Sequence, residues 1–509
     1  MKKTITTLAL VFFCILINAQ TASLKWGPIY EDKDCSDGYF FCYGQNENGY
    51  YRNTYHKKNK VVQKFNNQHQ IVASKELNYN TPNEKLFGIN ASLFINKELY
   101  RFAYTSRSKV ITMYRKKFSE DLGEESEWEE FDKFVDISQS NISNDVLIEK
   151  SEDESKFIIY IENKNKELTI TGKAYDKDFN KIWDKEFDLK TGYWEYPKPI
   201  KLLTNDGAFI YFGRFEKKKG DDNYSTAKER LILCDKNGIS SYEFGVDKNF
   251  VSNITLMLDN ETKKITLAGF YSDKETGFYE YQTQGSDIGY LYKEIDLNTR
   301  KIAIDVVKAF DPTVMVKDTY KKQSQEINLI SSKYLARKMV KRENGEISMV
   351  SEYSQMFSSS VSNFPDYGNY AIQDILVVNF DQKGNMTKTF IIPKKQLTGA
   401  LQMGSFLLHI VKNKLVFVFY DNERNNGKKG YAAEEVTLYR GDINTAVIAS
   451  ITCDFDGNIS QREIIYKKGK SDKNVPYLNI GKAKKINENK YFVEDSRNKN
   501  YQCGYITFE

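Results

Sequence analysis

The sequence predicts an all-β protein, a single β-propeller of four-stranded blades, with seven blades favoured and eight as the alternative. Three observations predict this fold. Two kinds of short turn alternate along almost the whole chain, turns of one kind recur every 53 to 84 residues, and aromatic residues are abundant. A unit that repeats every ~40–50 residues or more is typical of propellers.

The first kind of turn precedes a strongly apolar run. Asn96-Lys97 precedes ELYRFAY, and Asn413-Lys414 precedes LVFVFY. Asn, Asp and Gly accept the positive φ that tight hairpins require, so such turns between β-branched and aromatic residues predict hairpins. Turns of this kind lie near Asp37, Asn96, Asp153, Asp206, Asn260, Asn344, Asn413 and Asn489.

The second kind of turn opens with Asp or Asn directly after a predicted strand. The segments 235–238, 381–384 and 454–457 all begin with Asp and end with Gly. These turns alternate with the first kind and lie near Asn66, Asp121, Asp176, Asp235, Asp296, Asp381 and Asp454. Two hairpins in each period give four strands, which is one propeller blade.

The blade count follows from the number of turns. Eight turns of the first kind and seven of the second imply about thirty strands. That number fits seven blades with a surplus hairpin, or eight blades of which one is shared between the two ends of the chain. The clearest internal match supports the repeat, because segments 381–395 and 454–468 share seven identical residues in fifteen positions.

The 35 tyrosines and 32 phenylalanines suit the packing of sheet on sheet, and a sugar-stacking surface is the alternative interpretation. An insertion at 318–342 is predicted as either an amphipathic helix or a long strand pair, since its apolar residues recur roughly at helical spacing. The segment 354–370 reads as a polar loop that carries the aromatic side chains of Phe357, Phe364 and Tyr367.

The N-terminus has the features of a signal peptide, predicted to span residues 1–19 and to be removed near Ala19-Gln20. Lys2 and Lys3 precede a ten-residue apolar stretch at 8–17, which is too short to cross a bilayer. No later run reaches eighteen apolar residues, so no transmembrane segment is expected. We expect the remaining chain, 20–509, to form the propeller domain and to be periplasmic, exposed at the cell surface or secreted.

Cysteine, histidine and acidic residues give no catalytic motif. In an exported protein Cys35 and Cys42 are a candidate disulfide, with a Cys42–Cys503 pair as the alternative. Cys234 and Cys453 precede equivalent turns and are expected to be small buried residues. The turns at Asp176 and Asp454 resemble calcium loops but lack the required ligands, so they are interpreted as hairpins. We therefore predict no metal, no cofactor and no catalytic residue, although a carboxylate-based enzyme stays open.

A basic surface is the candidate partner site. Lys394 and Lys395 follow one repeat, and Lys467, Lys468 and Lys470 follow the matching repeat one blade later. Two interpretations stay open: these lysines are solvated side chains that meet no other molecule, or they form a patch that, together with the loop at 354–370, meets an acidic glycan or protein. The formal charge of +5, which falls to +3 without the leader lysines, is too mild to predict binding to nucleic acid. The sequence predicts no particular oligomeric state.

Three segments resemble uncharacterised exported proteins of Bacteroidota: AGFYSDKETGFY, DILVVNFDQKGNMTKTFIIPKKQ and FVFYDNERNN. The resemblance implies an exported, propeller-like protein, and it implies no known activity. The sequence then favours an exported, non-enzymatic binding or scaffolding propeller that engages an envelope protein or a glycan. The alternative is a carbohydrate-active hydrolase or lyase with acids that converge on the propeller channel.

Overall fold

The structure, a computed structural model, forms strands almost throughout the residues that it describes. These are residues 21–31, 41–56, 59–78, 86–95, 98–123, 126–135, 146–163, 169–188, 199–215, 228–246, 249–273, 286–311, 330–331, 333–356, 370–398, 405–428, 436–439, 445–467, 477–478, 480, 483–497 and 500–509. Within them the chain forms 34 strands and one short 3₁₀ helix. No helix of the described part is long and apolar enough to cross a bilayer.

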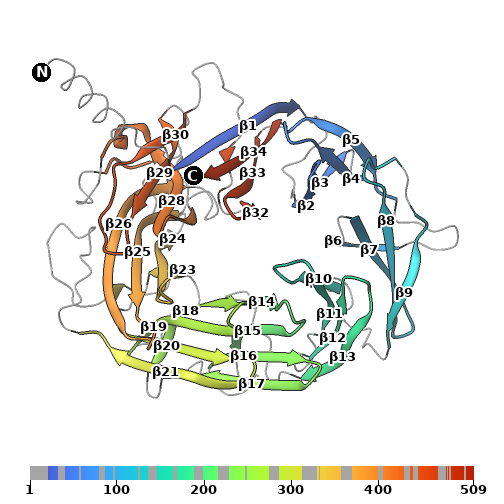
Figure 1. Cartoon of the computed structure of the whole chain (residues 1–509), viewed down its shortest axis with the longest axis horizontal. Coiled ribbons are helices and arrows are strands. Elements are labelled where there is room, and N and C mark those ends of the chain that lie inside the picture. The colour runs from blue at the N-terminus through green and yellow to red at the C-terminus, as the bar shows by residue number, and fades with distance from the viewer. Residues whose placement is uncertain are drawn as a thin grey trace, which may run out of the picture. The chain divides into compact units, whose positions relative to one another are not determined.

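The strands form eight antiparallel sheets, and each sheet is one blade (Figure 1). The first four blades each contain four consecutive strands. Blade 1 is β2 (Phe41–Asn46), β3 (Gly49–His56), β4 (Asn59–Phe65) and β5 (Ile71–Glu76). Blade 2 is β6 (Phe87–Ile95), β7 (Glu98–Arg107), β8 (Val110–Phe118) and β9 (Glu129–Phe134). Blade 3 is β10 (Val146–Lys150), β11 (Lys156–Asn163), β12 (Thr169–Asp176) and β13 (Lys181–Asp188). Blade 4 is β14 (Ile200–Leu203), β15 (Phe209–Phe215), β16 (Lys228–Asp235) and β17 (Gly238–Phe244).

The next three blades repeat the pattern with small additions. Blade 5 is β18 (Phe250–Asp259), β19 (Lys264–Ser272), β20 (Ser286–Asp296) and β21 (Lys301–Ala309), and β22 (Ile330–Ser331) also pairs with β20. Blade 6 is β23 (Tyr334–Lys341), β24 (Ile347–Met356), β25 (Tyr370–Phe380) and β26 (Met386–Thr398). Blade 7 is β27 (Phe406–Val411), β28 (Lys414–Asn422), β29 (Ala446–Cys453) and β30 (Glu463–Lys467), with the 3₁₀ helix η3 (Glu423–Asn425) after β28.

Blade 8 is built from both ends of the described chain. Strand β1 (Ala22–Glu31) pairs antiparallel with β34 (Asn500–Phe508), from Ala22 opposite Phe508 to Glu31 opposite Asn500. Strand β34 in turn pairs with β33 (Lys490–Arg497), and β31 (Tyr477–Leu478) and β32 (Lys484–Asn487) pair with β33. The predicted propeller of four-stranded blades is confirmed, but the favoured count of seven is wrong. The hairpin near Asn489 is not surplus, because β1 supplies the outer strand of an eighth blade.

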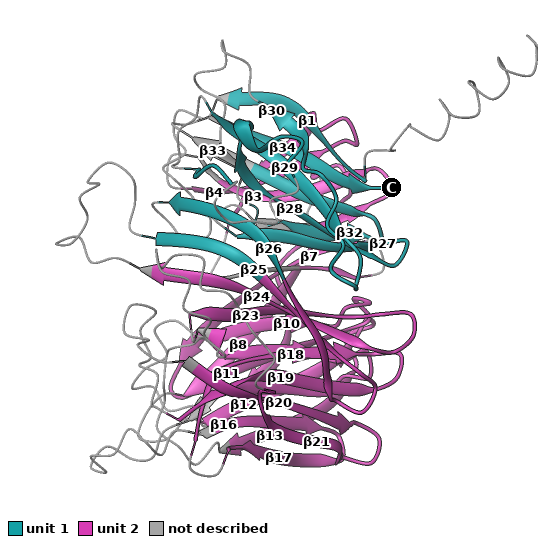
Figure 2. Ribbon diagram, turned by 90° about the vertical axis from the view of Figure 1, so that its left-hand side faces the viewer, with its two compact units in different colours: residues 1–31, 357–375, 391–509 teal, residues 32–356, 376–390 magenta. Residues whose placement is uncertain are grey.

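The chain divides into two compact units, which Figure 2 shows in different colours. One unit contains residues Met1–Glu31, Phe357–Ile375 and Ile391–Glu509, and the other contains Asp32–Met356 and Leu376–Phe390. The strands of blades 1 to 5 lie in the second unit, and the strands of blades 7 and 8 lie in the first unit. Blade 6 contributes strands to both units.

The core of each unit consists of apolar layers between neighbouring blades. The second strand of a blade is buried on both faces, as in β19 and β28, where all but one residue of each is buried. Between blades 2 and 3 the layer contains Phe102, Phe157 and Tyr175, and the Phe157 and Tyr175 rings stack 5.0 Å apart. The described aromatic residues of these layers therefore serve sheet-on-sheet packing, which contributes most of the apolar burial.

The two kinds of turn lie where the sequence predicts them. In the described turns, the first kind joins the first and second strands of a blade, and the second kind joins the third and fourth. Blade 1 is an exception, because its first turn lies at Glu47-Asn48 instead of near Asp37. Asp37 and Asn96 lie outside the described residues.

Three turns of the second kind share one hydrogen-bond pattern, that of an Asx turn. The Oδ1 atom of Asp176 accepts from the backbone N–H groups of Asp178 and Asn180, both at 2.9 Å, and Oδ2 accepts from Asn180 Nδ2 at 3.0 Å. Asp381 and Asp454 repeat these three bonds in blades 6 and 7. The resemblance to calcium loops is thus explained by turn chemistry, since the carboxylate oxygens already accept hydrogen bonds from the turn.

The insertion at 318–342 forms a strand in its described C-terminal part. Tyr334–Lys341 is β23, so the helix alternative is wrong for these residues. A β-bulge between Ala336 and Lys338 shifts the alternation of side chains, and Tyr334 and Met339 are therefore both buried. Because of the bulge, the buried residues of this strand have a spacing in the sequence that resembles that of a helix. Residues 318–329 lie outside the described part.

Candidate functional site

The lysines that the sequence predicts to form one surface differ in their exposure. Lys394 is fully buried in β26, so it is not part of an exposed surface. Its backbone N–H donates to Asp374 Oδ1 at 3.1 Å, and its Nζ lies 5.9 Å and 5.8 Å from the ring centroids of Phe406 and Phe419. An ammonium over two aromatic faces is stabilised by their quadrupoles, so Lys394 belongs to the interior of this region.

Two of the predicted lysines are accessible. Lys395 is half-buried in β26, and its carbonyl accepts from the Tyr439 N–H at 2.9 Å. Lys467 ends β30 with 55% of its side chain exposed, and its Nζ forms an ion pair with Glu423 of η3. The other proposed surface residues lie outside the described residues; these are Lys468, Lys470, Phe357, Phe364 and Tyr367.

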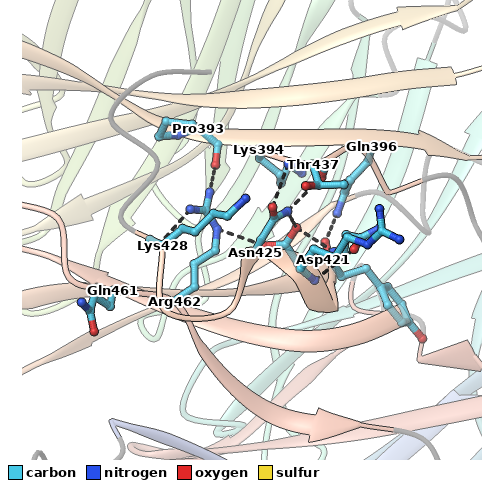
Figure 3. Close-up of polar contacts among 12 residues, drawn as sticks. Pro393, Lys394, Gln396, Asp421, Asn425, Lys428, Thr437, Gln461 and Arg462 are labelled. Carbon is cyan, nitrogen blue, oxygen red and sulfur yellow. Dashed lines mark hydrogen bonds and ion pairs between the residues drawn. The ribbon is translucent and has the colours of Figure 1, made fainter. Parts of the chain in front are cut away.

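A buried polar network, which the sequence does not predict, connects Asp421, Asn425 and Arg462 of blade 7 with β26 of blade 6 (Figure 3). Asp421 is the penultimate residue of the apolar strand β28, and only 2% of its side chain is exposed. Its Oδ1 accepts from the Asn422 N–H at 2.8 Å and from Asn425 Nδ2 at 2.6 Å, and its Oδ2 lies 2.9 Å from Arg462 Nε. The contact between Asp421 Oδ2 and Arg462 Nε is an ion pair, because the two atoms are close but their geometry is not that of a hydrogen bond.

Arg462 connects two blades through this network. Its guanidinium is 1% exposed and donates through Nη2 to the Pro393 carbonyl of blade 6 and through Nη1 to the Lys428 carbonyl at 3.3 Å. Burial lowers the pKa of Arg462, and burial raises the pKa of Asp421 while the Arg462 charge opposes that rise. A buried ion pair needs such additional hydrogen bonds to offset the loss of hydration.

Asn425 extends the network to a third segment. Its Nδ2 also donates to the Thr437 carbonyl at 2.9 Å, and its Oδ1 accepts from the Thr437 N–H at 2.7 Å. The Gln396 side chain donates to the Tyr420 carbonyl from the β26 side. The network therefore holds β26, which carries Lys395, against blade 7 and against Arg462, which directly precedes β30.

A sequence signal for this network exists but is weak. In the internal repeat, Arg462 occupies the position that Thr389 has one blade earlier. A long basic side chain at a position that is otherwise short and polar can indicate a specific buried partner. Asp421 and Asn425 lie in FVFYDNERNN, a segment that the sequence marks only as the end of a strand.

The described cysteines and histidines occupy structural positions. Cys234 and Cys453 are buried free thiols, as predicted, and burial raises the pKa of the Cys234 thiol to about 12. Cys503 is buried in β34, whereas Cys35 and the side chain of Cys42 lie outside the described residues, so the disulfide stays a prediction. His69 is buried with Nδ1 3.1 Å from the Tyr50 hydroxyl, and the His409 ring lies 4.5 Å from that of Phe508.

Among the described residues, no three His, Cys, Asp or Glu side chains gather in a way that could hold a metal ion. The candidate functional site is the basic surface of blades 6 and 7, because two of the predicted lysines, Lys395 and Lys467, are accessible there. We define it as the accessible residues Lys395 and Lys467 together with the segments that the buried network holds, 393–396, 421–428 and 462–467.

Comparisons with known proteins give no family. No protein-family model matches the chain, and no curated protein matches it. Among solved structures, the WD40 domain of SCAP from fission yeast has a TM-score of 0.42 at 8% identity and covers 94% of this chain and 98% of that chain. The polysaccharide lyase Uly1 has a TM-score of 0.38 at 10% identity and covers 85% of this chain and 93% of that chain. Similarity at this level supports no inference about activity.

Proposed function

We propose that the protein is an exported, non-enzymatic binding or scaffolding propeller whose basic surface on blades 6 and 7 engages an acidic glycan or an acidic envelope protein. In this proposal the leader is removed near Ala19-Gln20, and the mature protein acts in the periplasm or at the cell surface. Amino-terminal sequencing of the mature protein tests the export step, and an uncleaved Met1 terminus would contradict it.

The observation that carries the proposal is the Asp421–Arg462 network under the basic surface. It ties β26, η3 and β30 together through buried hydrogen bonds, so Lys395 and Lys467 extend from a fixed backbone. A preorganised surface loses little conformational entropy when a partner binds, which favours affinity.

The charge of the basic surface supports an acidic partner. Without the buried residues Lys394, Asp421 and Arg462, its segments carry four basic side chains and two acidic ones, a net charge of +2. Arg424 and Lys467 are exposed and Lys395 and Lys428 are half-buried, whereas Asp421 and Arg462 are buried and compensate each other. Attraction between exposed charges is screened beyond ~10 Å at 0.1 M salt, so binding of this kind should weaken as salt rises.

The test measures binding of a purified polyuronate to the mature protein by calorimetry. At an ionic strength of about 0.05 M we expect saturable binding, and at about 0.3 M we expect much weaker binding. The double variant K395E/K467E should bind at least about tenfold more weakly at low salt. Its matched control is K177E/K236E, which makes the same charge change at two exposed turn lysines of blades 3 and 4.

Two outcomes would overturn the proposal. Equal loss of binding in K395E/K467E and K177E/K236E would show a general charge effect instead of a site. Shortening of the polyuronate, followed by its chain length after incubation, would show a hydrolase or lyase instead of a binding protein.

A further inference from the structure

A second polar cluster lies where blades 3 and 4 meet, within one compact unit and separate from the basic surface. It contains five side chains: Glu149 of β10, Tyr160 and Glu162 of β11, Lys201 of β14 and Tyr211 of β15. Both tyrosines are fully buried, Glu162 has 4% of its side chain exposed, and Lys201 has 18% exposed.

Lys201 occupies the centre of this cluster. Its Nζ forms an ion pair with Glu162 Oε1 and lies 5.4 Å and 5.6 Å from the ring centroids of Tyr160 and Tyr211. The ammonium of blade 4 is thus held by a carboxylate and an aromatic ring of blade 3 and by an aromatic ring of its own blade. The contacts form a joint between the two blades.

Glu149 brings a second carboxylate to the same ammonium. A parallel bridge between Ser151 and Leu203 places Glu149 of β10 level with Lys201 of β14. Leu147, two residues earlier on the strand, packs in the layer between blades 3 and 4, whereas Ile148 packs toward blade 2. Glu149 therefore faces blade 4, where the titratable groups around it are Lys201, Glu162, Tyr160 and Tyr211.

The charges in the cluster do not balance when both carboxylates are ionised. One ammonium faces two carboxylates, and the Tyr160 hydroxyl stays neutral because burial raises its pKa far above the usual range. A surplus negative charge in a buried setting is costly unless a proton neutralises it. Glu162 holds the ion pair with Lys201, so Glu149 is the group that takes the proton.

We propose that Glu149 is a proton-operated link between blades 3 and 4. With Glu149 protonated, Lys201 pairs with Glu162 alone and the joint is tight. With Glu149 ionised, the surplus charge loosens the joint.

The direction of the pH effect follows from the environment of Glu149. Burial raises the pKa of Glu149 from 4.5 to about 6, the Lys201 charge and the Tyr160 hydroxyl oppose the rise, and Glu162 adds to it. A carboxyl group whose pKa is higher in the folded state stabilises the fold at low pH. That stabilisation is lost as pH rises from about 4.5 through about 6, so the joint should loosen above pH 6.

The test compares the wild type with E149Q by hydrogen exchange of the β10 and β14 amides, with each pair measured at the same pH. At pH about 7.5 we expect several-fold slower exchange in E149Q, and at pH about 5 we expect equal exchange. The control is E152Q, a change at an exposed turn residue of the same blade, which should equal the wild type at both values. A difference between E149Q and the wild type that is independent of pH would overturn the proposal.

A second measurement follows the proton of Glu149 in the wild-type protein itself. Titration of the Glu149 carboxyl in the intact wild-type protein, followed by NMR of isotope-labelled glutamate with E149Q used only for assignment, should give a midpoint between about 5 and about 7. A midpoint near that of an exposed glutamate would show that the cluster does not hold a proton at Glu149, and the link would be disproved.

Discussion

The buried guanidinium of Arg462 links blade 7 to blade 6 and is expected to contribute strongly to the stability of this region. Replacing it with methionine removes the cation and leaves the Asp421 carboxylate buried beside an apolar side chain. Loss of one partner of a buried ion pair typically costs about 3–5 kcal/mol. We expect R462M to lower the free energy of unfolding by this amount in guanidinium denaturation.

The control for R462M is R424M. Arg424 lies in segment 421–428, three residues after Asp421, but is exposed, so its replacement should change the free energy of unfolding by less than about 0.5 kcal/mol. Equal effects of R462M and R424M would show that the Asp421–Arg462 pair does not hold this region together.

Asp287 is a second buried carboxyl, and its environment differs from that of Asp421. It is fully buried at the start of β20, and among the described residues neither of its carboxyl oxygens has a hydrogen-bond partner. Burial raises its pKa from 3.8 to about 7, and the Ser252 side chain opposes the rise. The folded state therefore favours the protonated form, and its stability falls as pH rises from about 4 to about 7.

The variant D287N should remove this loss of stability. At pH about 8 we expect it to unfold at a higher denaturant concentration, with a gain of up to roughly 4 kcal/mol for a shift of three pKa units. At pH about 3.5 the two proteins should be equally stable, because both side chains are then neutral. A gain of the same size at both pH values would contradict the assignment, and D206N, an exposed change, serves as the control.

At the level of single residues, the sequence predicted whether a side chain is buried better than it predicted which distant residues contact it. It predicted the burial of Cys234 and Cys453 because each occupies a strand position normally filled by a large apolar residue. It placed Lys394 on a surface because two consecutive lysines usually face solvent. The aromatic faces of Phe406 and Phe419, which are distant in sequence, are what allow Lys394 to be buried.

The turns show the same chemistry at the level of the element. Gly384 occupies the fourth position of the Asx turn that Asp381 opens, with φ of 79°, and a Cβ there would lie 2.4 Å from the Tyr292 ring. Gly427 has a similar φ of 74°, but nothing lies within 4 Å of its Cβ position. A comparison of substitutions at the two glycines therefore separates the cost of backbone strain from the cost of a steric clash.

We expect G384A to destabilise the protein by about 2–4 kcal/mol, and G427A by only about 1 kcal/mol. The smaller cost is the left-handed conformation of a residue with a side chain, and the larger one adds overpacking against a buried ring. Thermal unfolding of both variants provides the measurement. Equal costs would mean that Tyr292 moves aside freely and that the close approach does not fix the turn.

The backbone conformation of Phe179 is one that the local sequence does not predict. It takes the position of Gly384 in the blade 3 turn with φ of 65°, although a bulky residue rarely adopts this conformation. Its ring lies 4.9 Å from that of Tyr100 and 5.4 Å from that of Phe157, and the Arg115 guanidinium lies 4.0 Å above it. Burial among these groups stabilises a backbone that the local sequence alone would not predict.

For the whole molecule, the local turn chemistry predicted the fold class, and distant pairing decided the blade count. Each described hairpin depends on residues a few positions apart, so a repeated pattern in the sequence identifies it. The pairing of β1 with β34 joins segments more than 400 residues apart, and no local pattern encodes that register. The sequence therefore left seven and eight blades open.

Blade 8 is the blade that both ends of the described chain share. Ala22, Ile506 and Phe508 are buried in one apolar cluster with Val493 and with residues of blade 7. Removal of β31 to β34 exposes that cluster and leaves the backbone of β1 without its partner strand. Loss of stability should therefore spread beyond blade 8 into blade 7.

Calorimetry of a chain that ends after residue 475 tests this claim most directly. We expect the thermal transition of the full-length protein to be lost or lowered by roughly 10 °C or more, and partly restored when the segment 476–509 is supplied as a separate chain. A truncated protein that keeps the full-length transition would show that β1 and β34 do not build a common blade.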